Sequence, residues 1–167
     1  MKLSEIIYEV PVLAPPEKTW DVLVRFGDVG DFLSVVSTSH PLNGNGTRAI
    51  LGAERYCELP NGSCTIYLSE RITAFEDGKS YTYDVFDWKH FPLARMENRF
   101  EVRPNGQGNS VLQQRARFRL RPGFLTVLAK GKLRKGIRET LLAYKHKIET
   151  GESNTDVKRL SKKYREL

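Results

Sequence analysis

A chain of 167 residues, 40% of them apolar, is long enough to bury one sizeable core in a single domain. No run of eighteen apolar residues occurs, so the sequence predicts no membrane span. Lys2, Glu5 and Glu9 interrupt the apolar stretch that a secretory signal requires, and we expect a cytoplasmic protein.

The net charge of +7 is concentrated in the last quarter of the chain. Residues 121–167 hold 13 Lys/Arg and 5 Asp/Glu, a net of +8, whereas residues 1–120 hold the other 14 and 15. Such asymmetry is found in proteins with an acidic partner, RNA or an anionic membrane surface. The favoured interpretation here is a solvated helix face followed by a soluble polar tail.

The first fifty residues predict a strand, two short helices and a loop. Apolar residues alternate over residues 6–12, which indicates a strand with one buried face. Pro15 and Pro16 end it and favour a helix start, so we expect a helix over residues 17–26 with Trp20 on its apolar face. A second short helix is expected over residues 28–33, and residues 37–47 are expected to be a loop or a weak edge strand.

From Thr47 to Leu120 the chain reads as strands separated by regularly spaced turns. The pattern then becomes helical over residues 124–149, and Gly151 follows as a stop. The apolar positions of this long helix are Leu125, Leu128, Ala129, Leu133, Ile137, Leu141, Tyr144 and Ile148. Residues 1–151 are therefore expected to form the domain, and residues 152–167 a basic polar tail, either disordered or a frayed helix.

A hairpin at Asn61-Gly62 predicts which side chains point inward. In a two-residue turn residues 60 and 63 would pair, so that Leu59 meets Cys64. One face then carries Arg55, Cys57, Leu59, Cys64, Ile66, Leu68, Glu70 and Ile72. This face is mostly apolar, so we expect it to point inward, with both cysteines reduced and too far apart for a disulfide.

Arg55 and Glu70 are two charges on this otherwise apolar face. One interpretation is a structural ion pair that fixes the register of the hairpin, although buried pairs seldom add much net stability. The other is a pair of polar anchors in a ligand cavity, because pockets place a few polar groups in apolar walls. Both residues could also serve as catalytic groups, since burial and a neighbouring charge tune a carboxyl group for acid–base work.

The later strands predict further inward positions. Met96, Asn98 and Phe100 share one face, and Leu112, Gln114 and Ala116 share another, with Asn98 and Gln114 as polar exceptions. Between residues 81 and 88 both faces are amphipathic, and we favour Tyr81 and Tyr83 as the inward pair. The opposite faces carry alternating arginines and glutamates, which predicts an outer charge ladder in solvent.

Common catalytic motifs are absent from the sequence. It contains no Gly-rich phosphate loop, HExxH, GxSxG or CxxC, so we expect no metal and no cofactor. His40, His90 and His146 fall in a loop, a turn and a helix end, and we expect all three at the surface.

Four segments together resemble a known superfamily. They are VLAPPEKTWDVLVRFGDVGDF at 12–32, GAERY at 52–56, SERITAFED at 69–77 with YTY at 81–83, and LAYKHKIETG at 142–151. Their order and spacing are similar to those of the START-like, polyketide cyclase/dehydrase and lipid-transport superfamily, which includes the birch-pollen allergens. The resemblance implies an α+β helix-grip fold: a seven-stranded, curved antiparallel sheet wrapped around a long C-terminal helix, with two short helices after the first strand.

The resemblance also implies a cavity for a lipid, polyketide or similar ligand, lined at the positions of Arg55, Glu70, Met96 and Asn98. The leading hypothesis is therefore a protein that binds or transports a hydrophobic small molecule. Its expected ligand-binding residues are Arg55, Cys57, Leu68, Glu70, Tyr81, Tyr83, Met96, Asn98, Gln114, Leu133 and Ile137.

Two alternatives remain open. The first is a polyketide cyclase or dehydratase in which Arg55 stabilises an enolate and Glu70 moves protons. The second is a ribosome-, RNA- or quinone-associated member of the superfamily, suggested by the basic last quarter. Nucleic acid is not the favoured partner, and a monomer or homodimer is expected.

Overall fold

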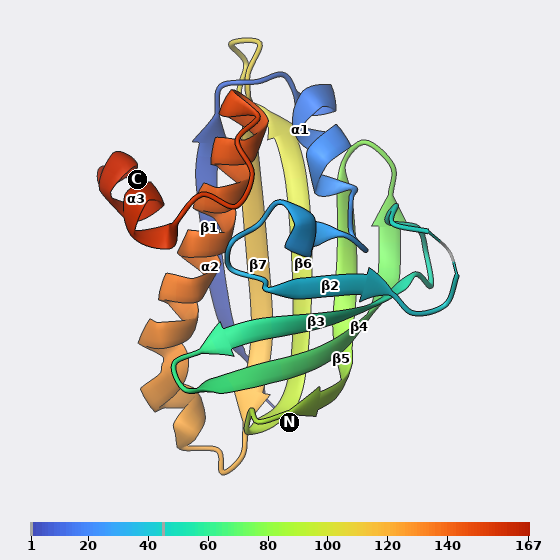
Figure 1. Cartoon of the computed structure of the whole chain (residues 1–167), viewed down its shortest axis with the longest axis vertical. Helices are drawn as coiled ribbons and strands as arrows, with labels where there is room; N and C mark the ends of the chain where they lie inside the picture. The colour runs from blue at the N-terminus through green and yellow to red at the C-terminus, as the bar shows by residue number, and fades with distance from the viewer. Residues whose placement is uncertain (1, 45) are drawn as a thin grey trace.

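The computed structural model describes residues 2–44 and 46–167, so Asn45, in the predicted loop over residues 37–47, lies outside it. Seven antiparallel strands form one curved sheet in the order β1-β7-β6-β5-β4-β3-β2 (Figure 1). Their bounds are β1 Ser4–Val12, β2 Thr38–Pro41, β3 Glu54–Asn61, β4 Cys64–Glu76, β5 Ser80–Lys89, β6 Leu93–Pro104 and β7 Ser110–Leu120. The predicted weak edge is thus the four-residue strand β2.

Two short helices follow β1, and a long one follows β7. Helix α1 spans Pro16–Leu23, with proline at its start, where a missing N–H costs nothing. It ends three residues before the predicted end, and the predicted helix over 28–33 is one 3-10 turn, η1, Val29–Asp31. Helix α2 spans Leu125–Thr150 and ends at Gly151, whose φ of 78° suits a residue without a side chain. The seven-stranded sheet and these helices confirm the predicted fold class.

The β3–β4 hairpin differs from the predicted register by two residues. Asn61 pairs with Cys64, so Gly62 and Ser63 form the turn, and Arg55 lies directly opposite Glu70. Gly62 has a φ of 65° and occupies the first turn position, as in a type II′ turn. The predicted register is wrong, but a shift of two residues keeps each side chain on the same face of the sheet, so the predicted inward face is correct. Cys64, however, lies at the hairpin tip and is exposed, whereas Cys57 is buried.

The outer face of β1, β6 and β7 carries the predicted charge ladder. Arg117 on β7 pairs with Glu97 on the neighbouring strand β6 at 3.3 Å, and Arg103 on β6 pairs at 2.7 Å with Glu9 on β1, across the intervening strand β7. Such exposed pairs contribute little stability individually, about 0–1 kcal/mol. The inner face is apolar and packs on α2, α1 and η1, so the core lies between the sheet and the helices.

The C-terminal segment differs from the expected disordered or frayed tail. Residues Val157–Lys163 form a short helix, α3, whose N-terminus is capped by the Asp156 side chain. Leu160 is only 1% exposed, because it packs into the main core. His146, expected at the surface, is buried in this contact and lies within hydrogen-bond distance of Tyr164 Oη (2.9 Å) and Glu152 Oε2 (2.8 Å). A mostly polar sequence with a single apolar anchor gave no periodic signal for this packing.

Candidate functional site

A cavity of about 530 Å³ lies between the concave face of the sheet and α2. The segment 33–36, after η1, covers one side of it, and α2 covers another. Its rim includes the exposed residues Pro60, Lys132, Lys135 and Gly136, so it opens between the β3–β4 hairpin and the first half of α2. The Lys132 ammonium donates a hydrogen bond of 2.7 Å to Asn61 Oδ1 across this opening.

Ten of the eleven predicted ligand-binding residues line this cavity: Arg55, Cys57, Leu68, Glu70, Tyr83, Met96, Asn98, Gln114, Leu133 and Ile137. Eight of them come from strands β3 to β7 and two from α2. The alternation of side chains along each strand directs the strand residues to the concave face, and the helix period places Leu133 and Ile137 opposite them.

Arg55 and Glu70 form a buried ion pair in the cavity wall. Arg55 Nε lies 2.5 Å from Glu70 Oε2, and the two side chains are 7% and 5% exposed. Arg55 also donates to the Phe26 carbonyl oxygen (2.8 Å), and its guanidinium lies 4.1 Å from the centre of the Phe26 ring. These contacts hold the guanidinium in one place, so its charge is fixed beside the cavity rather than free to swing into it.

Cys57 lies next to this pair on the same face. Its sulfur is 3.9 Å from Glu70 Oε2, and the side chain is buried. Burial raises the pKa of the thiol to about 12, against the opposing effect of the Arg55 charge. The thiol is therefore protonated at neutral pH, which makes Cys57 a poor nucleophile in the folded protein.

A second polar pair, Asn98 and Gln114, lies on the neighbouring strands β6 and β7. Gln114 Nε2 donates a hydrogen bond of 3.0 Å to Asn98 Oδ1, and the two residues are 5% and 2% exposed, respectively. Gln114 Oε1 has no hydrogen-bond partner within the described residues. A buried acceptor without a donor is costly, about 1–3 kcal/mol, so this oxygen is the natural place for a ligand donor.

Aromatic rings form the inner end of the cavity. Tyr83, Phe100 and Tyr144 line it, and Phe100 lies 6.2 Å from Tyr83 and 5.8 Å from Tyr144, centre to centre. Burial raises the pKa of Tyr144 to about 12 and that of Tyr83 above its ordinary value. Both phenols are therefore neutral donors at physiological pH.

Tyr81 does not line the cavity, contrary to the prediction. It points inward, as expected, but its hydroxyl donates to the Leu23 carbonyl oxygen at 3.2 Å, and its ring packs against Trp20 and Phe26. The packing of α1 over this end of β5 fills the space in front of it, and sequence alternation alone cannot reveal which inward positions a helix covers.

Sequence reasoning missed the residues that reach the cavity from irregular segments. Val29, Leu33 and Val36 line it from η1 and the segment that follows, and Val157 lines it from α3. These segments are too short to show a repeating pattern of apolar residues, so the sequence does not reveal which of their side chains face inward. Tyr144 was predicted as a core position of the long helix but not as a cavity residue. A phenol hydroxyl within an otherwise apolar helix face was the feature of the sequence that could have indicated a cavity position.

A family model described as "Polyketide cyclase / dehydrase and lipid transport" matches residues 5–149. This match covers the seven strands except for the first residue of β1, and α2 except for its last residue, and it ends before α3. A search of curated proteins gives no significant match.

Solved structures share the fold at low sequence identity. The Zhui aromatase/cyclase from a Streptomyces species has a TM-score of 0.76 at 12% identity, over 88% of this chain and 94% of that one. A Thermus thermophilus protein has a TM-score of 0.74 at 14% identity, over 90% of this chain and 100% of that one. A major latex-like protein from Panax ginseng has a TM-score of 0.67 at 12% identity, over 91% and 99%. These likenesses establish the helix-grip fold.

Proposed function

The chain belongs to the polyketide cyclase / dehydrase and lipid transport family, and from this premise we propose that it binds a hydrophobic small molecule in the cavity under α2. The observation that carries the proposal is the cavity itself, whose volume of about 530 Å³ falls within the range of about 300–1,000 Å³ typical of ligand sites. Its walls are mostly apolar, so burial of apolar ligand surface would supply the driving force, about 25 cal/mol per Å².

The polar groups of the cavity narrow the class of ligand. Gln114 Oε1 is buried and unpartnered in the described part of the chain, so a bound molecule with a hydroxyl or N–H group would satisfy it. Phe100, Tyr83 and Tyr144 offer ring faces to an aromatic or flat alicyclic body. We therefore favour a phenolic or hydroxylated polycyclic molecule over a plain fatty acyl chain.

Extraction of the purified protein tests this proposal. An organic extract analysed by mass spectrometry should contain a hydrophobic molecule in stoichiometric amount. The Leu133→Trp variant, which places a larger side chain at the cavity wall, should yield much less of it. Leu13→Trp, at a residue 70% exposed and outside the cavity lining, is the matched control and should retain it. Equal yields from Leu133→Trp and the unmodified protein would argue against binding in this cavity.

The second candidate is an enzyme of the cyclase or dehydratase type. It is favoured by one observation, that the Glu70 carboxylate and the Arg55 guanidinium line the same cavity side by side. Glu70 would move a proton of the substrate and Arg55 would stabilise the enolate. Incubation with a synthetic linear poly-β-ketone tests it: Glu70→Gln should abolish cyclisation or water loss while Gln114→Leu leaves a measurable rate. Unchanged substrate with the unmodified protein would leave binding as the function.

A further inference from the structure

Three large apolar side chains at the start of α2 lie in solvent. Phe124, Val127 and Leu128 are 64%, 75% and 73% exposed, although Leu128 was expected on the buried face. Successive helix residues are turned by about 100°, so these three share one side of the first turn, opposite Thr126 and Leu133, which face the sheet. Core packing therefore does not explain them, and contiguous exposed apolar side chains mark an interaction surface.

Positive charge surrounds this cluster. Residues 121–138 contain six Lys or Arg and no Asp or Glu. Lys135 pairs with Glu139 at 3.7 Å. Four other cations of the stretch are exposed and have no carboxylate within ion-pair distance among residues 2–44 and 46–167: Arg121, Lys130, Lys132 and Arg134. Uncompensated cations beside apolar side chains fit a partner that is negatively charged at its surface and apolar beneath it.

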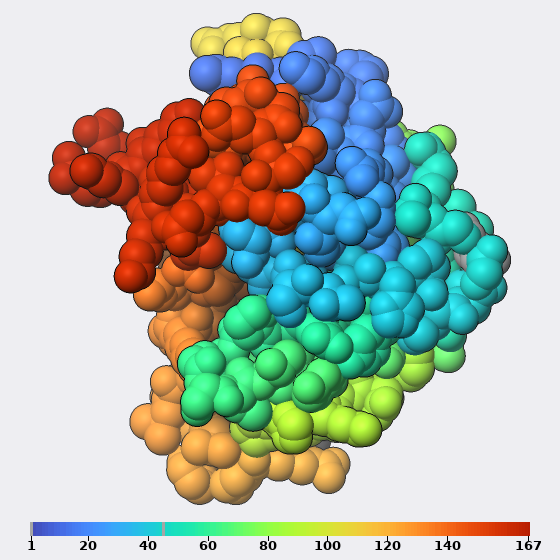
Figure 2. Space-filling model, in the orientation of Figure 1, coloured from blue at the N-terminus to red at the C-terminus, as the bar shows by residue number. Residues whose placement is uncertain are grey.

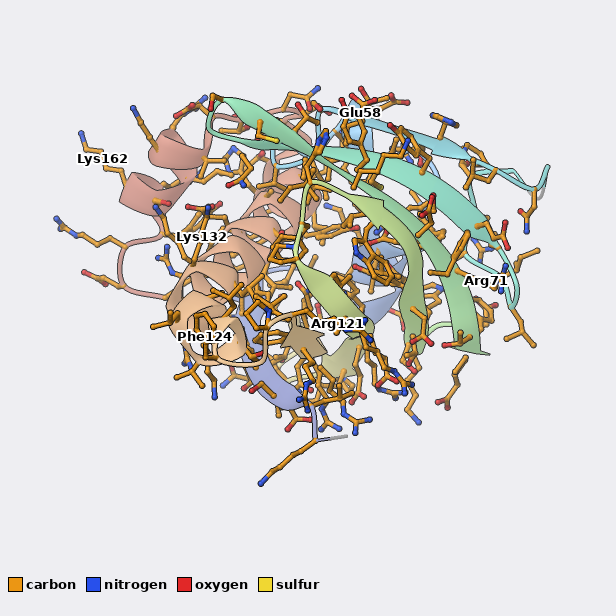
Figure 3. All side chains as sticks on the ribbon, turned by 90° about the horizontal axis from the view of Figure 1, so that it is seen from below. Glu58, Arg71, Arg121, Phe124, Lys132 and Lys162 are labelled. Atoms are coloured by element: carbon orange, nitrogen blue, oxygen red, sulfur yellow. The ribbon has the colours of Figure 1, made fainter. Side chains whose placement is uncertain are left out.

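The cluster lies at a protruding end of the molecule. In Figure 2 the first turns of α2 form the lowest part of the surface, and Figure 3 looks at this end from below, with Arg121, Phe124 and Lys132 labelled. Ala129 and Lys132, within the next turn of the helix, already line the cavity. The exposed apolar cluster and the cavity opening are thus adjacent on α2.

We propose that the start of α2, residues 121–134, docks on the surface of an anionic lipid bilayer. Phe124, Val127 and Leu128 enter the boundary between headgroups and acyl chains, and the four cations pair with lipid phosphates. No helix in the described part of the chain is long and apolar enough to span a membrane, so the contact is peripheral. Docking brings the cavity opening to the bilayer, where a hydrophobic ligand is dissolved.

Two other partners fit the surface less well. A second copy of the chain would place the same patch on both subunits, as twofold symmetry requires, and would bring the four unpaired cations of each copy together. RNA would satisfy the cations, but Val127 and Leu128 offer no ring face on which bases stack, and their exposure would remain unexplained. The bilayer accounts for both the apolar and the charged residues.

Vesicle co-sedimentation with the full chain tests the proposal without reference to any cavity ligand. The protein should bind vesicles of phosphatidylcholine mixed with phosphatidylglycerol, bind pure phosphatidylcholine more weakly, and dissociate as salt is raised. The combined change of Phe124, Val127 and Leu128 to Ser should weaken binding about tenfold or more, because the inserted apolar area is lost. Arg121→Ser with Lys130→Ser should weaken binding to the anionic vesicles about tenfold and leave binding to pure phosphatidylcholine unchanged.

Matched controls separate this surface from general hydrophobicity or charge. Leu13→Ser with Leu51→Ser removes two leucines that are 70% and 66% exposed elsewhere, and Lys162→Ser with Arg165→Ser removes two cations near the C-terminus. Both control proteins should bind like the unmodified chain. The proposal would be overturned if the unmodified protein bound no vesicles, or if the variant with serine at positions 124, 127 and 128 bound them fully. It would also be overturned if the unmodified protein formed a dimer that this variant loses, with no vesicle binding by either protein. Binding of an RNA homopolymer that needs the cations, without vesicle binding, would also overturn it.

Discussion

At the scale of single residues, the ion pair between Arg55 and Glu70 is both a buried structural contact and part of the cavity wall. The sequence placed both charges on an inward face because alternation along a hairpin is strict, and this facing is correct even though the turn lies one residue later than predicted. The direct pairing could not be predicted, because it depends on which residue of the turn adopts a positive φ.

Glu70→Gln should lower the free energy of unfolding by about 3–5 kcal/mol, because it leaves the Arg55 charge buried without its partner. The double variant Arg55→Met with Glu70→Leu should come within about 1 kcal/mol of the unmodified protein, since both desolvation costs disappear. Urea denaturation measures both values. A loss under about 1 kcal/mol for Glu70→Gln would show that the pair does not constrain the fold.

The two cysteines should differ sharply in reactivity. Cys57 is buried with a pKa of about 12, and Cys64 is exposed at the tip of the β3–β4 hairpin. Titration of the native protein with a thiol-specific disulfide reagent should therefore modify one thiol rapidly, and the second only after denaturation. Cys64→Ser should remove the fast reaction and Cys57→Ser should leave it intact. Rapid modification of both thiols in the native state would contradict this assignment.

At the scale of elements, long periodic segments were predictable and short irregular ones were not. The 26 residues of α2 and the long strands β4, β6 and β7 repeat their patterns often enough to indicate the element type and, except at Leu128, the buried face. In β5 both faces are amphipathic, so its pattern indicates a strand without deciding which face is buried. Helix α3 has seven residues and one buried apolar side chain, Leu160, so its docking depends on the surface that α2 presents. The cavity residues from the segment 33–36 escaped prediction for the same reason.

Helix α3 should be held to the domain chiefly by Leu160. Leu160→Ala removes most of a side chain that is 1% exposed, which typically costs about 2–5 kcal/mol of packing. The cost should appear as local opening: amide hydrogens of residues 157–163 should exchange faster while those of β6 and β7 stay protected. Lys162→Ala, at an exposed position of α3, is the control. Uniformly faster exchange across the sheet would show instead that α3 is part of the cooperative core.

At the scale of the whole molecule, the buried phenols and thiol link stability to pH. The pKa values of Cys57 and Tyr144 are raised to about 12 by burial, and those of Tyr81 and Tyr83 are raised as well. The folded state therefore keeps protons that the unfolded chain loses above about pH 9 for the thiol and about pH 10 for the phenols. Because the folded state then binds more protons, the free energy of unfolding falls as the pH rises through this range.

Urea denaturation between about pH 8 and about pH 11 measures this fall, which approaches about 1.4 kcal/mol per pH unit for each group that only the unfolded chain has deprotonated. Tyr144→Phe removes one of these groups and should make the slope shallower. A slope unchanged by Tyr144→Phe would mean that its phenol titrates alike in both states.

The architecture as a whole was predictable from the sequence, whereas the cavity lining was predictable in part and the exposed apolar cluster at the start of α2 was not. Ten of the eleven residues expected from strand facing, the helical period and the superfamily resemblance lie around one cavity. The exposed cluster at the start of α2 could not be seen, because Leu128 fits the helical period of the core and only the three-dimensional position of the sheet shows that it faces solvent.

The most direct test of the account is a fluorescence titration with 8-anilinonaphthalene-1-sulfonate, an amphiphilic probe that brightens in apolar pockets. The protein should bind one probe molecule saturably, Leu133→Trp should weaken this binding at least tenfold, and Leu13→Trp should leave it unchanged. A titration that does not saturate, or one that Leu133→Trp leaves unaltered, would show that the cavity under α2 is not a binding site.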